Sequence, residues 1–143
     1  MIIEELLPAI DDALGAALPR AVLGWSMGGY GALHLAAHHP GAFRAAVAAS
    51  PALWRSFDEA SPGAFDGAAD FARNDVYADR STLADTVVRV DCGTDDGFLD
   101  AARAFAEGLP HANPGQFTEG FHEDAYWRSI AADQLSTIAS ALA

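Results

Sequence analysis

The sequence has no lysine, a single cysteine and no apolar stretch long enough to cross a membrane, because Gly, Pro or charged residues interrupt every hydrophobic run. The sequence contains eight arginines and 20 acidic residues, so the net charge is −12. Such a surface repels nucleic-acid phosphates and anionic lipid headgroups, and we therefore expect no nucleic acid and no membrane among the partners. The lone cysteine, Cys92, excludes an internal disulfide.

Length and composition indicate one folded domain over residues 1–143, since half of the residues are hydrophobic and the chain is long enough to bury a core. The N-terminal residues, Met1 to Glu5, are acidic where a signal peptide carries positive charge, so we expect a cytoplasmic location. No glycine-rich nucleotide motif and no metal-ligand spacing of His or Cys is present, so neither a cofactor nor a metal is predicted.

Hydrophobic periodicity predicts helices that alternate with short strands. Helices are expected at 3–14, 27–39, 98–109 and 124–142, and strands at 20–25, 45–49, 87–92 and 116–118. Residues 51–85 are irregular and contain scattered aromatics, which is typical of a cap or a crossover excursion. Alternation of this kind favours an α/β fold with a mostly parallel sheet.

The last predicted helix begins after a polar segment, with Asp124 as the expected cap. Its apolar positions are predicted to line one buried face. These positions are Trp127, Ile130, Leu135, Ile138 and Leu142.

The strongest chemical motif is Gly24-Trp25-Ser26-Met27-Gly28-Gly29, which we call the elbow. It follows a predicted strand and opens a predicted helix, which is where a nucleophile elbow lies. A turn this sharp forces Ser26 into a strained conformation, and glycines two positions before and after leave room for it. The Met27 amide is then an oxyanion donor. The alternative is a glycine-rich turn with an idle serine.

A serine hydroxyl needs a base, and an acid that orients the base. In a Ser, acid, His chain order, the acid comes from Asp95 or Asp96, which follow the strand that ends near Cys92. His122 lies between the last strand and the last helix, where a loop can reach the serine. It is the predicted base among five histidines, and the other four lie on the helix after the elbow or behind Pro110.

Three segments together resemble the esterase D-like branch of the α/β hydrolases, which includes S-formylglutathione hydrolases, feruloyl esterases and mycolyltransferases. They are the elbow with its continuation to Leu33, the acid loop Gly93-Thr94-Asp95-Asp96-Gly97-Phe98-Leu99, and Gly120-Phe121-His122. The resemblance implies hydrolysis of a carboxylic ester or thioester through an acyl-enzyme. It also implies that the second carboxylate, Asp96, is the triad acid. Two alternatives are an acyltransferase on the same triad and a non-catalytic remnant that serves as an assembly module.

The resemblance covers the C-terminal portion of that fold only. Members of the branch have four more strands before the helix that opens this chain, and they take a second oxyanion donor from a loop after the third strand. The strand at 20–25 is therefore expected at a sheet edge, and an apolar edge invites pairing. We expect either two copies of the chain to pair there or a complementing N-terminal half to cover it.

Overall fold

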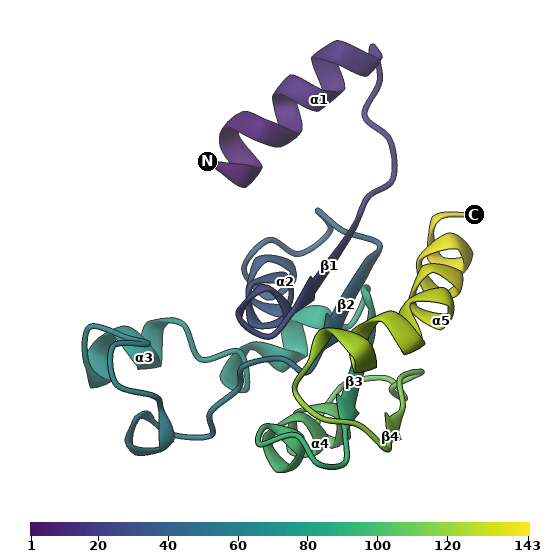
Figure 1. Ribbon diagram of the computed structural model, residues 1–143. Coiled ribbons are helices and arrows are strands. Elements are labelled where there is room, and N and C mark those ends of the chain that lie inside the picture. Colours follow the sequence, from purple (N-terminus) through teal and green to yellow (C-terminus); the bar gives the residue numbers. More distant parts are fainter.

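The computed structural model describes all 143 residues, which form a parallel sheet with helices packed on both of its faces (Figure 1). The strands are β1 (Ala21–Trp25), β2 (Ala45–Ala49), β3 (Val87–Gly93) and β4 (Phe117–Thr118). They lie in the order β1-β2-β3-β4, and every neighbouring pair is parallel. The predicted α/β class, with about four mostly parallel strands, is confirmed.

Five α-helices connect and flank the strands, together with short turns of π- and 3₁₀-helix. The α-helices are α1 (Leu7–Leu14), α2 (Met27–His38), α3 (Ala68–Arg73), α4 (Leu99–Glu107) and α5 (Asp124–Leu142). The short turns are η1 (Ile2–Leu6), η2 (Phe57–Glu59) and η3 (Ala78–Leu83). The expected helix at 3–14 is thus divided, because Pro8 lacks an amide hydrogen and is accommodated in the first turn of α1, after the π-helical η1.

Strand side chains alternate between the two faces of the sheet. One face packs against α2 and α4, where Leu33 and Phe105 are fully buried with Val90. The other face packs against α5 through Tyr126 and Ile130. The helices therefore fix the sheet from both sides, and the carboxyl ends of the strands stay open to carry loops.

The central strand β2 consists of four alanines and one valine, and every residue in it is fully buried. Alanine has a low intrinsic preference for strands, but its small side chain suits a strand that is covered on both faces. The tertiary environment determines this strand more than residue propensity does.

The start of α5 differs from the prediction. Glu123 is the N-cap residue, and no side chain accepts a hydrogen bond from the first helical amides. Asp124 already lies inside the helix and pairs with Arg128 one turn later. Asp124 as the cap is therefore wrong, because its side chain points along the exposed helix surface toward a cation.

The buried face of α5 also differs in part from the predicted one. Tyr126, Ile130 and Gln134 are buried at spacings of four residues, whereas Leu135 is 61% exposed. The polar Gln134 was missed because an apolar pattern cannot reveal a buried amide. Its surroundings, described below, explain why it is buried.

β1 forms one edge of the sheet, as expected. Leu23 is 36% exposed and Trp25 is 50% exposed. Helix α1 stands away from the sheet in Figure 1, and Leu6 of η1 is exposed together with Ile10 and Leu14 of α1. This end of the molecule therefore presents apolar side chains next to unpaired strand backbone.

No helix has the length and apolarity that crossing a membrane requires.

Candidate active site

Ser26 occupies the junction between β1 and α2 with φ 53° and ψ −119°. A positive φ is unfavourable for a residue with a side chain and persists only where the surroundings enforce it. Here the Ser26 N–H donates to Ala49 O at 3.0 Å, and its carbonyl accepts from the amides of Tyr30 and Ala52, each at 3.0 Å. These backbone hydrogen bonds, to α2 and to β2 with the segment that follows it, hold the strained turn in place.

The glycines of the elbow serve the turn unequally. A Cβ on Gly24 would overlap the carbonyl oxygen of Gly28, and a Cβ on Gly29 would lie 3.1 Å from Pro51 Cα. A Cβ on Gly28 itself, or on Gly31, would meet nothing within 4 Å. The prediction that Gly28 leaves room for the serine is therefore wrong. The close backbone approaches fall at Gly24 and Gly29.

His122 reaches Ser26 from the loop between β4 and α5, which we call the histidine loop (residues 119–123). Its Nε2 atom lies 2.8 Å from Ser26 Oγ. The imidazole side chain is 33% exposed. The base candidate chosen from chain order is thus the histidine that the fold places against the hydroxyl.

Asp96 lies on the other side of the imidazole, with Oδ2 2.8 Å from His122 Nδ1. Its side chain is completely buried. A carboxylate only accepts hydrogen bonds, so Nδ1 carries the proton and Nε2 is left to accept from the Ser26 hydroxyl. That tautomer is the one that a general base requires.

The two carboxylates of the acid loop (residues 93–99) have different surroundings. Asp96 Oδ1 also accepts the Phe98 N–H at 2.9 Å, so one residue both shapes the start of α4 and contacts His122. Asp95 is exposed, and its carboxylate accepts the Thr94 hydroxyl at 3.3 Å. Asp96 therefore contacts both His122 and the amide of the residue that precedes α4, although no side chain caps the helix itself.

The acid loop and the histidine loop are in direct backbone contact. Thr94 N–H donates to Thr118 O at 2.9 Å, and Asp95 N–H donates to Gly120 O at 3.0 Å. A Cβ on Gly93 would overlap the Gly120 carbonyl, and one on Gly120 would overlap the Tyr126 ring. Glycine at both positions therefore permits the approach that brings the two loops together.

Two aromatic rings flank His122. Phe98 lies 5.4 Å from the imidazole and Trp127 lies 5.3 Å from it, measured between ring centroids. Trp25 stacks on Trp127 at 5.8 Å, and Trp54 meets Phe98 edge to face at 5.6 Å. The sequence placed Trp127 only on a helix face, since contacts between separate elements leave no local pattern.

Met27 is the first residue of α2, so its amide has no acceptor within the helix. The helix directs its positive end, and this amide, toward the region of Ser26. The Met27 side chain is 77% exposed and points away from the core. The backbone of Met27 is thus available for a developing negative charge.

Cys92 is fully buried next to the site at the end of β3. Burial, together with the negative charge of Asp96, raises the pKa of the Cys92 thiol to about 12. The thiol is therefore protonated at neutral pH and is not a nucleophile.

The other histidines lie elsewhere. His34 Nε2 contacts Asn74 Oδ1 at 2.9 Å, and His38 stacks on His34 at 3.9 Å. Burial lowers the pKa of His34. His111 contacts the Ala84 carbonyl. Each of these contacts joins the histidine to the segment between β2 and β3 or to its own helix, and none involves Ser26.

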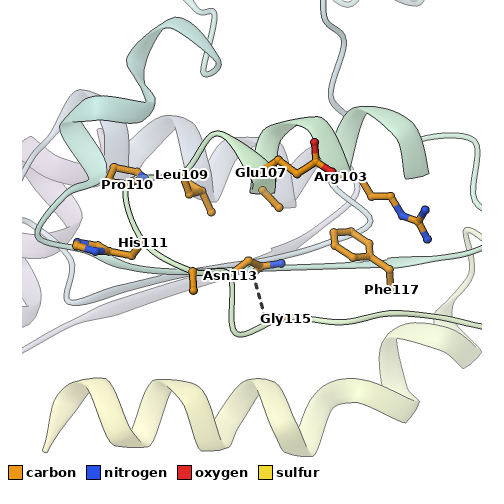
Figure 2. A pocket seen from close by; sticks show the side chains of 10 residues that line it. Arg103, Glu107, Leu109, Pro110, His111, Asn113, Gly115 and Phe117 are labelled. Atoms are coloured by element: carbon orange, nitrogen blue, oxygen red, sulfur yellow. Dashed lines mark hydrogen bonds between the residues drawn. The ribbon is translucent and has the colours of Figure 1, made fainter.

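The largest cavity, of about 640 Å³, lies between α4 and the segment that leads to β4 (Figure 2). Its lining residues are Arg103, Ala106, Glu107, Leu109, Pro110, His111, Ala112, Asn113, Gly115 and Phe117. Asn113 is already engaged, because it exchanges two hydrogen bonds with Val90 backbone and accepts the Gly115 N–H. None of Ser26, Asp96 and His122 lines this cavity, so it is separate from the candidate site.

A protein-family model described as "Putative esterase" matches residues 1–134. The chain belongs to this esterase family. The match includes the elbow, the acid loop and the histidine loop of the esterase-family chain. No curated protein sequence matches it.

Solved structures resemble the esterase-family chain in fold. A ferulic acid esterase has a TM-score of 0.76 at 24% identity, over 97% of this chain and 58% of its own. An S-formylglutathione hydrolase from Agrobacterium tumefaciens has a TM-score of 0.71 at 21% identity, over 99% of this chain and 56% of its own. MPT51 from Mycobacterium tuberculosis has a TM-score of 0.73 at 21% identity, over 94% of this chain and 66% of its own. The chain thus spans 56–66% of the length of these structures.

Proposed function

We propose that the chain hydrolyses carboxylic esters or thioesters through an acyl-enzyme on Ser26. The observation that carries this proposal is the continuous hydrogen-bond chain from Ser26 Oγ to His122 and on to Asp96, with both contacts at 2.8 Å. A buried carboxylate, an oriented imidazole and a hydroxyl on a strained turn are the parts that nucleophilic acyl transfer needs. Membership of the esterase family supports the same reaction class.

In the first half-reaction, Ser26 Oγ attacks the acyl carbon while its proton passes to His122 Nε2. The carbonyl oxygen becomes an oxyanion that the Met27 amide can hydrogen-bond. The imidazolium then returns the proton to the leaving alcohol or thiol, which departs as the C–O or C–S bond breaks. Asp96 stabilises the imidazolium without taking its proton.

In the second half-reaction, water takes the place of the leaving group. His122 removes one proton from the water as its oxygen attacks the acyl carbon of the Ser26 ester. Collapse of the tetrahedral intermediate breaks the bond to Oγ, and the imidazolium reprotonates the serine. The products are the carboxylic acid and free enzyme.

The Ser26→Ala variant tests this assignment. It should abolish both hydrolysis of p-nitrophenyl acetate and labelling by a fluorophosphonate probe, because both require the hydroxyl. Ser140→Ala is the matched control, since the Ser140 hydroxyl contacts only the Ser136 carbonyl within α5. Ester hydrolysis retained by Ser26→Ala would exclude the assignment. A wild-type chain that neither labels nor hydrolyses would favour an assembly module instead.

We also propose that polypeptide outside these 143 residues pairs with the β1 edge. The edge is apolar and open, and the similar structures match nearly all of this chain while being considerably longer. Such a partner could supply a second oxyanion donor beside Met27. Loss of one such donor raises the barrier by about 3 kcal/mol, so the chain alone is expected to be a slow catalyst.

A further inference from the structure

Outside the candidate triad, the most highly connected polar group in the core is the Arg89–Asp91 ion pair on β3. The two residues are separated by one position, so both side chains lie on the face of the sheet that α5 covers. Their side chains are 6% and 0% exposed. Arg89 Nε donates to Asp91 Oδ2 at 2.9 Å and Nη2 donates to Oδ1 at 2.9 Å.

The Asp91 carboxylate also binds two groups from other elements. Oδ1 accepts the Gln116 N–H at 2.9 Å, and Oδ2 accepts from Gln134 Nε2 at 2.8 Å. Gln116 immediately precedes β4, and Gln134 lies in the middle of α5. One buried carboxylate thus connects β3, β4 and α5.

The histidine loop is the only segment between β4 and α5, so Asp91 ties down the chain on both sides of His122. The same strand continues into the acid loop, five positions before Asp96. We propose that Asp91, held by Arg89 and linked to α5 by Gln134, is a positioning residue that sets His122 against Asp96 and Ser26. This inference rests on the proposed function of the triad.

Energetics favour positioning over stabilisation as the role of this cluster. A buried ion pair is often no more stable than apolar residues of the same volume, because both charges must be desolvated. Gln134 Oε1 is buried without any hydrogen-bond partner, which is itself unfavourable. Apolar residues would avoid both penalties, but they could not make directional bonds to Gln116 and to α5.

The Gln134→Met variant tests the inference with the ion pair intact. It removes the bond to Asp91 together with the unpaired oxygen, at nearly constant volume. The Nδ1–H resonance of His122 in the proton NMR spectrum should broaden, and its pH titration should shift. The rate constant of fluorophosphonate labelling should fall about tenfold or more, because small displacements of reacting groups have large effects. The melting temperature should change little.

Two further variants complete the design. Arg89→Met/Asp91→Leu removes both charges together and should have a larger effect on the same resonance and rate. If the double variant does not fold, the Gln134→Met variant alone decides whether the cluster positions His122. Thr137→Val is the matched control, because it removes the 3.0 Å bond from Arg89 Nη1 and leaves the Asp91 carboxylate contacts in place.

A folded Gln134→Met variant with the wild-type His122 resonance, titration and labelling rate would overturn the inference. If the wild-type chain itself is not labelled, the proposed function fails. The His122 resonance and titration still decide the positioning role in that case, because neither depends on activity.

Discussion

Ser26 Oγ and His122 Nε2 lie 2.8 Å apart although 96 positions separate the two residues. The hydroxyl is fixed by a strained turn after β1, at one edge of the sheet. The imidazole is carried by the loop that follows β4, at the opposite edge. The contact therefore forms only when all four strands are in register. Disruption of the sheet should therefore remove both the folded structure and any esterase activity. A change of a single site residue should remove the activity and leave the fold intact.

The Asp96→Asn variant should lower kcat for ester hydrolysis by about 10³–10⁴-fold, because an amide in place of the carboxylate favours the wrong imidazole tautomer. Steady-state kinetics with p-nitrophenyl acetate checks this. Asp95→Asn is the matched control, since Asp95 is exposed and does not contact His122. A larger loss in the Asp95 variant would reverse the assignment of the acid.

Gly24→Ala and Gly28→Ala should have opposite effects on the free energy of unfolding, measured by urea denaturation. A methyl group on Gly24 overlaps the Gly28 carbonyl and should destabilise by about 1–3 kcal/mol. A methyl group on Gly28 meets nothing within 4 Å and lies in a helix, so it should stabilise by up to about 1 kcal/mol. Equal destabilisation by both changes would contradict the described turn.

The sequence was sufficient to predict the elements that carry the site, because each has a strong local signal. The glycines around Ser26, the turn after His39 and the alternation of strands and helices fixed the order of β1, α2, β2 and β3. Chain order then narrowed the base to His122. Resemblance, rather than local pattern, selected Asp96 over Asp95.

The contacts between elements could not be predicted in the same way. The apolar pattern of the last helix did not include Gln134, and no local pattern links it to Arg89 and Asp91, although the three residues form one buried cluster. A charged pair at alternate positions of a buried strand was the available signal. The partners of that pair lie more than 20 positions away, and only the assembled fold brings them together.

The Cys92 thiol should react with iodoacetamide about 10³-fold more slowly in the native chain than in concentrated urea at about pH 8. Burial and the neighbouring Asp96 charge raise its pKa to about 12 from an ordinary value of 9.0, so the thiolate fraction falls by that factor. Mass spectrometry of the alkylated chain follows the reaction. Rapid native alkylation would contradict the buried site and would make Cys92 a competitor for electrophilic probes.

The chain on its own should associate reversibly, because the exposed β1 edge has unpaired backbone groups beside Leu23 and Trp25. Sedimentation velocity over a range of concentrations should show a rising average mass. Leu23→Lys should shift the distribution toward monomer, since a charge on an edge strand opposes pairing. Leu135→Lys should leave it unchanged, because Leu135 is 61% exposed on α5, away from the edge.

A soluble monomer at every protein concentration would contradict the prediction that the β1 edge drives association. Equal effects of both lysines would instead indicate association through general apolar exposure. Association that is specific to β1 and is suppressed when a complementing polypeptide is added would support the partner proposed above. Ester hydrolysis should then rise with the added polypeptide, by up to about 100-fold for one regained oxyanion donor. Covering of the edge without a gain in rate would mean that the partner stabilises the sheet and leaves the site unchanged.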